Sequence, residues 1–310
     1  MKKIILTLAS LALSFALVSA QDLTSATEKY NQGAEQLQNG DKAAALASFQ
    51  EALKIGEALG DDGAEFVANC KKVIPGVILS IGKEKFNEKD FAAAAEKFQE
   101  ASTVATQYGD EETSAEAANL IPQAYTQAGR AAITAKDMAG AAENFKKVLA
   151  IDPTNGNAAL YLGQALSATG DVEGAKEAFN TALANGQEAA KKQLGNLALK
   201  EAQAALKEGK NADVVSIVSQ ADAEGLISNA AAYQLAASAS SKLGKTADAI
   251  KFYEKFLDTD PSNKNFGAIA YTVGALYQQQ KNNAKALEFY KKAQTAGYAD
   301  AAKMVQQLSK

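Results

Sequence analysis

The residue types on which most enzyme chemistry depends are scarce in this sequence. Its 310 residues contain no His and a single Cys, Cys70, and Arg130 is the only arginine among 32 basic residues. Without His there is no imidazole base, no Ser-His-Asp triad and no histidine metal site. One Cys excludes an internal disulfide and a cysteine-cluster zinc site. We therefore expect a protein that is not an enzyme and that has no catalytic residues, no metal site and no cofactor.

Three local groups could still do chemistry, and each has a simpler interpretation. Gly244-Lys245-Thr246 resembles the end of a phosphate-binding loop, but such a loop follows a strand. Here the preceding residues have a helical pattern, so the sequence favours a turn between two helices. Asp61-Asp62 and Asp110-Glu111-Glu112 lack the alternating ligands and the glycine of a calcium loop, and are interpreted as helix N-terminal acids.

Cys70 also has a simpler, structural interpretation. It has Phe66, Val73 and Val77 near it in helical register, which predicts a buried structural thiol rather than a reactive one. Lys71 and Lys72 are expected to point to other faces of the helix, so no cation activates the sulfur.

Net charge and the first twenty residues bear on partners and location. The net charge of −4 argues against nucleic acid as a partner, because phosphate neutralisation needs a cationic excess. Lys2 and Lys3 precede an apolar run, Ile4 to Val18, that ends in Ser19-Ala20. This pattern is typical of a cleaved signal peptide, and the run is shorter than the roughly 20 residues of a membrane-spanning helix. An uncleaved anchor is the alternative.

Residues 1–20 are therefore interpreted as a signal peptide, and 21–310 as the mature chain. Its first residue, Gln21, is not the Cys that lipid attachment requires, and removal of Lys2 and Lys3 takes the net charge from −4 to −6. No later segment is long and apolar enough to span a bilayer. We expect an exported, periplasmic protein, with secretion from the cell as the second choice.

A pattern of small and aromatic residues recurs along the mature chain. Six times an aromatic residue follows an alanine four residues earlier: Ala45/Phe49, Ala94/Phe98, Ala141/Phe145, Ala175/Phe179, Ala249/Tyr253 and Ala286/Tyr290. Sixteen residues before these aromatics lie Gly33, Gly82, Gly129, Gly163, Ala237 and Gly274. A worn seventh copy places Ala202 and Val218 in the same two slots. Small residues in a helix let a neighbouring helix approach, so the spacing predicts helix pairs that stack on one another.

The repeat resembles the tetratricopeptide repeat. Phe145 and Phe179 are 34 residues apart, which is the length of that repeat, and Gly40-Asp41 and Gly170-Asp171 match its turns, with Lys89-Asp90 and Lys136-Asp137 as variants. The resemblance covers almost all of 25–310. It implies an all-α protein, an α-solenoid of about seven helix-turn-helix repeats with a C-terminal capping helix at 299–310.

The first three repeats are longer than the later four. Phe49 and Phe98 are 49 residues apart, and Pro75 and Pro122 each lie seven residues before a glycine of the repeat. We expect lengthened helices in repeats 1–3, kinked or broken at the prolines, and near-standard helices in repeats 4–7. Leu59-Gly60-Asp61-Asp62 and Tyr108-Gly109-Asp110-Glu111 are each interpreted as a glycine C-cap followed by an acidic N-cap.

The resemblance also implies a ligand surface, because the first helices of these repeats line a concave face. Matched residue by residue, the candidate partner-binding positions are Tyr30, Leu37, Leu79, Lys83, Phe86, Thr126, Arg130, Leu160, Gln164, Gln203, Gln234, Tyr271 and Gln278. Asn does not accompany Lys83 and Arg130, which argues against the carboxylate clamp of some members. An ordinary solvated face is the alternative.

We therefore expect a non-catalytic scaffold for protein–protein interaction in the bacterial envelope, which binds a protein or peptide. The alternative is a periplasmic module that binds a small ligand, a glycan or peptidoglycan. The sequence leaves the identity of the partner and a homo-oligomer open.

Overall fold

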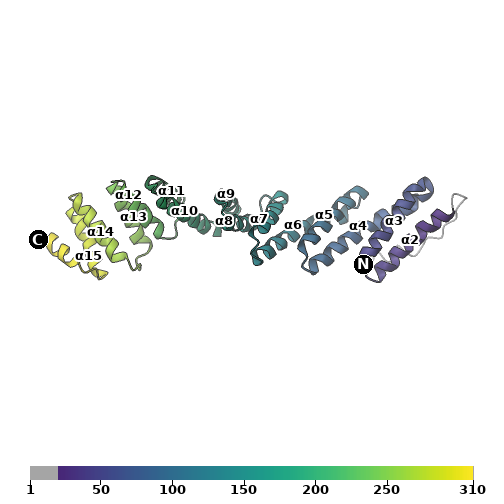
Figure 1. Cartoon of the computed structure of the whole chain (residues 1–310), viewed down its shortest axis with the longest axis horizontal. Coiled ribbons are helices and arrows are strands. Elements are labelled where there is room, and N and C mark those ends of the chain that lie inside the picture. Colours follow the sequence, from purple (N-terminus) through teal and green to yellow (C-terminus); the bar gives the residue numbers. More distant parts are fainter. Residues whose placement is uncertain (1–19, 310) are drawn as a thin grey trace. The chain divides into compact units, whose positions relative to one another are not determined.

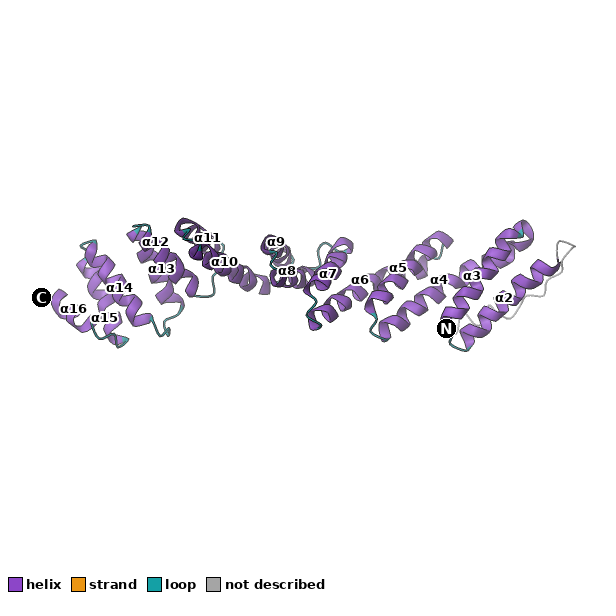
Figure 2. Cartoon of the chain, in the orientation of Figure 1, coloured by secondary structure: helices purple, strands orange, loops and turns teal. Residues whose placement is uncertain are grey.

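The computed structural model describes residues 20–309, and all its regular elements are helices (Figure 2). They are α2 (Ala20–Gln38), α3 (Lys42–Ala58), the short 3-10 helix η2 (Gly60–Gly63), α4 (Ala64–Asn87), α5 (Phe91–Tyr108), α6 (Glu111–Thr134), α7 (Met138–Ile151), α8 (Gly156–Thr169), α9 (Val172–Ala184), α10 (Ala189–Lys207), α11 (Asn211–Ala223), α12 (Ala231–Lys242), α13 (Thr246–Thr259), α14 (Phe266–Gln279), α15 (Asn283–Thr295) and α16 (Ala301–Leu308). Within the described residues these form seven antiparallel pairs followed by one helix, which confirms the predicted all-α repeat architecture.

The contacts divide the chain into two compact units, 1–153 and 154–310. In its described part, the first unit holds the three pairs from α2 to α7, and the second holds the four pairs from α8 to α15 and then α16 (Figure 1). The predicted repeat array over 21–310 is thus built from two stacks of helix pairs. The predicted signal peptide, 1–20, lies outside the described residues except for Ala20.

The turn inside each pair has one design. A residue with positive φ ends the first helix: Gly40, Lys89, Lys136, Gly170, Gly209, Gly244 and Lys281. In five of the seven pairs the side chain of the next residue caps the second helix, and Asp171, for example, accepts a hydrogen bond from the backbone N–H of Gly174 at 2.9 Å. Asp41, Asp90, Asp137 and Asn282 do the same. These caps satisfy N–H groups that the first helical turn would otherwise leave free. Lys210 and Lys245 hold this position in the other two pairs and have no side-chain cap.

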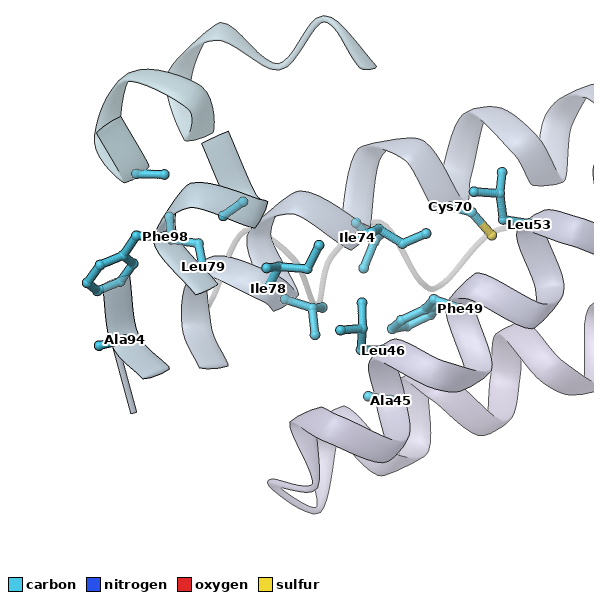
Figure 3. Packing of buried hydrophobic residues seen from close by; sticks show 14 of the residues in the cluster. Ala45, Leu46, Phe49, Leu53, Cys70, Ile74, Ile78, Leu79, Ala94 and Phe98 are labelled. Atoms are coloured by element: carbon cyan, nitrogen blue, oxygen red, sulfur yellow. The ribbon is translucent and has the colours of Figure 1, made fainter. Parts of the chain in front are cut away.

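The repeated glycines face the repeated aromatics. A Cβ added to Gly82 would lie 2.7 Å from the Phe98 ring, and one added to Gly163 would lie 2.5 Å from the Phe179 ring. Gly33, Gly129 and Gly274 face Phe49, Phe145 and Tyr290 in the same way. These aromatic side chains are almost fully buried, and Figure 3 shows Phe49 and Phe98 within the cluster of the first unit. The sixteen-residue spacing in the sequence therefore separates the glycine and the aromatic residue that meet in each helix–helix contact.

The two lengthened helices run through their prolines. α4 and α6 are 24 residues each, with Pro75 and Pro122 inside them. Both helices are longer than the 14-residue α8, and of the two predicted outcomes at the prolines, a kink or a break, the break does not occur. Cys70, Ile74 and Ile78 are buried along one face of α4, so tertiary packing holds the helix on both sides of Pro75.

One of the two predicted acidic caps is also wrong. Asp110 caps α6 and accepts from the backbone N–H of Thr113 at 3.0 Å, as expected. Asp61 and Asp62 instead lie in η2, and Gly63, without a side-chain cap, precedes α4. A Cβ on Gly63 would lie 1.9 Å from the carbonyl oxygen of Gly56. The backbones of these two glycines are therefore in direct contact, which a residue with a side chain at position 63 would prevent.

Two further predictions concern the second unit. Gly244 has a φ of +71° and α13 begins at Thr246, so the segment that resembles a phosphate-binding loop is a turn between helices. α16 keeps Met304, Val305 and Leu308 half-buried while Lys303 is exposed, as expected of a capping helix. No helix within 20–309 has both the length and the hydropathy that crossing a membrane requires.

Candidate functional site

A groove in the first unit is the strongest candidate for a binding site. Its volume is about 880 Å³, compared with about 500, 440 and 210 Å³ for three other pockets of the described chain. It lies between the second half of α4 and the start of α6, beside the first residue of α3. Its lining residues are Lys42, Gly76, Leu79, Ser80, Lys83, Glu84, Asn87, Glu88, Glu112, Thr113 and Glu116.

The lengthening of α6 builds one wall of this groove. In the near-standard repeat that follows, α8 begins at Gly156, seven residues before Gly163. Pro122 lies at the same distance before Gly129, the place where proline suits a helix start. α6 nevertheless begins at Glu111, and all three of its groove residues precede Pro122. The inserted turns thus add a surface that a standard repeat does not have.

The groove lining has one large apolar side chain, Leu79, and is otherwise mostly polar and acidic. Leu79 is only 5 % exposed and belongs to the packed cluster of the first unit (Figure 3). Glu84 on α4 lies one helical turn before Glu88, the C-cap of that helix, and Glu112 and Glu116 lie one turn apart on α6. With Lys42 and Lys83, the lining carries two positive and four negative side chains.

Ion pairs occupy three of the four carboxylates. Lys83 Nζ on α4 lies 2.6 Å from Glu116 Oε1 on α6, so this pair joins the two walls. Lys42 Nζ lies 2.7 Å from Glu84 Oε2. Glu88 pairs at 2.8 Å with Lys85, whose pKa this hydrogen bond raises. The exposed Glu112 carboxylate makes no ion pair with any described side chain.

Of the predicted partner-binding residues, the structure brings Leu79 and Lys83 together in the groove. The aromatic candidates pack against other rings of the chain. Tyr30 is buried edge-on against Phe49, with ring centroids 5.3 Å apart. Phe86 meets Phe91 at 5.1 Å, and Tyr271 meets Tyr290 at 5.1 Å.

The remaining candidates do not line the groove. Arg130 is exposed on α6, fourteen residues after Glu116, which is about 21 Å along the helix at its rise per residue. Leu37 is half-buried on α2 and packs against the core of the first unit, and Thr126 donates a hydrogen bond to the carbonyl oxygen of Pro122 at 2.7 Å. The others lie in the second unit: Leu160, Gln164 and Gln234 half-buried, Gln203 exposed, and Gln278 accepting from the Tyr290 hydroxyl at 2.9 Å.

Sequence reasoning missed most of the groove. Ser80, Asn87, Glu112 and Glu116 lie outside the positions that the family pattern assigns to ligands. The available signal was the insertion itself, because Glu112 and Glu116 stand in the segment that lengthens the third repeat. The acidic run 110–112 was correctly interpreted as a helix start. The same segment also contributes Glu112 to the groove lining.

The described residues contain no group of three or more His, Cys, Asp or Glu side chains placed to hold a metal ion. Cys70 is fully buried, as predicted, and burial raises the pKa of its thiol to about 12, so the sulfur is a neutral thiol at neutral pH. A smaller pocket of about 210 Å³ lies on α9, α10 and α11, where Lys176 Nζ is 2.6 Å from Glu201 Oε1.

The stacked pairs, the glycine–aromatic contacts and a groove on the first helices define a helical repeat protein. Sequence profiles of the tetratricopeptide repeat family match residues 132–197 and 230–263. The matches and the fold support a chain built from tetratricopeptide repeats, a class of repeat that builds scaffolds for protein–protein interaction. No curated protein sequence matches it significantly.

Solved structures with the same type of repeat resemble the chain more remotely. A crystal structure of MamA is 22 % identical, covers 59 % of this chain and 96 % of its own, and has a TM-score of 0.36. The TPR2AB domain of yeast Sti1, solved in a complex with pHSP90, is 16 % identical, covers 93 % and 99 %, and has a TM-score of 0.35. At these values the likeness carries no argument about ligands.

Proposed function

We propose that this protein is a non-catalytic scaffold of the bacterial envelope that holds a peptide segment of a partner protein in the groove between α4 and α6. The observation that carries the proposal is the groove itself. It is large enough for several side chains, has a buried leucine in its lining, and carries polar groups on both α4 and α6. Such a combination of apolar and polar lining groups is typical of peptide and protein interfaces.

The groove also offers groups that can bind a peptide backbone. Asn87 on α4 and Thr113 on α6 carry an amide and a hydroxyl group among the lining residues, and Ser80 adds a second hydroxyl. These groups donate and accept hydrogen bonds without adding charge. A segment lying along the groove would meet Leu79 with an apolar side chain and these three residues with its backbone.

The proposed location rests on the sequence of residues 1–20 alone. Two lysines, an apolar run and small residues before Gln21 support export to the periplasm. N-terminal sequencing of the protein recovered from a periplasmic fraction would test this. A chain that begins at Gln21 is expected, and a chain that stays with the membrane or keeps Met1 would contradict the proposal.

Binding of a glycan finds less support in the structure. A sugar-binding site commonly presents a flat aromatic surface, and the aromatic candidates Tyr30, Phe86 and Tyr271 each pack against a ring of the same chain. We therefore propose peptide binding as the single function of the groove.

Blocking the groove tests this function. A displayed library of short random peptides is selected on the full mature chain and, in parallel, on Asn87→Trp, in which an exposed groove residue becomes a large ring. We expect peptides that bind the wild-type chain and lose at least about tenfold in affinity on Asn87→Trp.

The matched control is Asn119→Trp. Asn119 is also exposed and lies on α6, but outside the groove lining. Binding should survive this change. If no peptide is selected, or if both variants bind as the wild type does, the groove is not the binding site.

A further inference from the structure

We infer that the groove selects a positively charged peptide segment, one with Lys or Arg side chains, which enter between the glutamates of α4 and α6. This inference rests on the proposed peptide binding and adds the chemistry of the partner. It is carried by the charges that line the groove and by the way in which the chain's own lysines already use them.

The lining has a surplus of two negative charges. Four glutamates and two lysines line the groove, and no other charged side chain belongs to it. Lys85 neutralises Glu88 from outside the lining, which leaves Glu112 as the carboxylate without an ion-pair partner in the described chain. A cation placed beside Glu112 would therefore gain an attraction that no internal group supplies.

The groove already binds ammonium groups. Lys83 Nζ reaches across it to Glu116 at 2.6 Å, and Lys42 Nζ reaches Glu84 at 2.7 Å. Both lysines are partly exposed, at 46 % and 24 % of the side chain, so water reaches the pairs. A partner's lysine can take the place of Lys83 at Glu116 at little cost, because a solvent-exposed ion pair contributes little to stability.

An acidic segment would meet the opposite situation. Its carboxylates would find both lining lysines already paired and would face four glutamates at close range. Breaking the pair of Lys83 with Glu116 would free one cation and expose one more anion, so nothing is gained. Like charges placed together in this way oppose binding.

The arrangement of the glutamates costs the helices some stability. Glu112 and Glu116 are a like-charge pair one turn apart on α6, and Glu84 lies one turn before Glu88 at the C-cap of α4; like charges at this spacing destabilise a helix. Glu111 and Glu112 both lie in the first turn of α6, where an acidic residue is favourable, so this effect does not distinguish them. Only Glu112 lines the groove, and this difference gives a matched pair for a test.

The experiment uses the peptides selected on the wild-type chain, with those retained on Asn87→Trp removed. We expect Lys and Arg to be enriched over the input library. We then measure affinity by fluorescence anisotropy on Glu112→Gln and on the control Glu111→Gln. Loss of one exposed charge pair predicts about a two- to fivefold weaker affinity for Glu112→Gln and no change for Glu111→Gln. Glu112→Lys should weaken binding more, and added salt should weaken the wild-type complex.

The outcomes separate the two claims. If groove-dependent peptides are selected without enrichment of Lys or Arg, or with enrichment of Asp and Glu, peptide binding stands and the charge selectivity is wrong. Equal losses on Glu111→Gln and Glu112→Gln would likewise overturn the selectivity. If no peptide depends on the open groove, the proposed function itself fails. Circular dichroism of each variant shows that the helices are intact.

Discussion

At the scale of single residues, each repeat matches the side-chain sizes at two positions sixteen residues apart, the first on its first helix and the second on its second helix. Where the first slot is Gly, the second is a nearly buried Phe or Tyr. In the worn fifth repeat the slots hold Ala202 and Val218, both fully buried, so a larger first residue is matched by a smaller second one. In the sixth, Ala237 is paired with Tyr253, which stays half-buried and whose pKa burial raises.

This balance predicts a coupled pair of substitutions. Gly163→Ala would place a Cβ 2.5 Å from the Phe179 ring. Overpacking costs about 1–3 kcal/mol, and the helical preference for Ala over Gly returns about 1 kcal/mol, so we expect a net loss of up to about 2 kcal/mol. With Phe179→Val added, the double variant should lose less unfolding free energy than the two single variants lose together. Denaturant unfolding of all four proteins measures this coupling, and strict additivity would contradict it.

The turn residues give a second prediction. Lys245 precedes α13 without a side-chain cap, whereas Asp171 caps α9 in the equivalent turn. Lys245→Asp should therefore raise the free energy of unfolding by about 0.5–2 kcal/mol, and Asp171→Ala should lower it by a similar amount. Thermal unfolding of both variants provides the measurement. Changes of equal sign in the two variants would show that the caps do not act in this way.

At the scale of elements, the lengthened helices show what the sequence can and cannot predict. The repeat slots, the turns and the cap helix followed from spacing, because each is decided within one helix pair. Pro75 and Pro122 were expected to kink or break their helices from local chemistry. α6 continues because Ala117, Ile121 and Ala124 are all buried on one face that spans Pro122. The groove was missed for a related reason: it forms between elements that the family pattern treats as separate repeats.

The persistence of α6 across Pro122 can be tested. Proline lacks the N–H that would bond to the carbonyl oxygen of Ala118, and in a helix interior it costs about 3 kcal/mol. Pro122→Ala should restore this hydrogen bond and stabilise the protein by about 1–3 kcal/mol. Chemical denaturation measures the change. A destabilised variant would mean that the proline is required where the inserted turns meet the standard repeat.

A polar contact joins three helices of the second unit and predicts a pH effect. Tyr233 on α12 donates to Asp222 Oδ1 on α11 at 2.6 Å, and Lys255 on α13 donates to the other carboxylate oxygen. Burial acts to raise the pKa of Asp222, but the hydrogen bonds from Lys255 and Tyr233 outweigh it, and the net pKa is lowered.

Because this pKa is lower in the folded protein, the contact stabilises the fold above the ordinary pKa of an aspartate. Its contribution is lost as the pH falls below that value towards the folded pKa. Asp222→Asn should therefore lower stability at pH 7 and flatten the loss of stability between about pH 5 and pH 2. Unfolding measured across this range tests the prediction. An unchanged pH profile would show that Asp222 does not supply the effect.

At the scale of the whole molecule, the two units differ in how regular their helix pairs are. The first unit carries the inserted helical turns, the long helices and the acidic groove, whereas the second is built from helices closer to the standard repeat. The regular repeats form the stack of helix pairs, and the extra turns of α6 form one side of the candidate site.

Site-specific photocrosslinking of the mature protein tests this account most directly. A photoreactive residue is placed at Asn87 in the groove or at Asn119 outside it, and the crosslinked partner segment is identified by mass spectrometry. We predict a crosslink from Asn87 to one defined segment of a partner protein, and none from Asn119. Crosslinks that form equally from both positions, or from Asn119 alone, would contradict a partner-binding groove between α4 and α6.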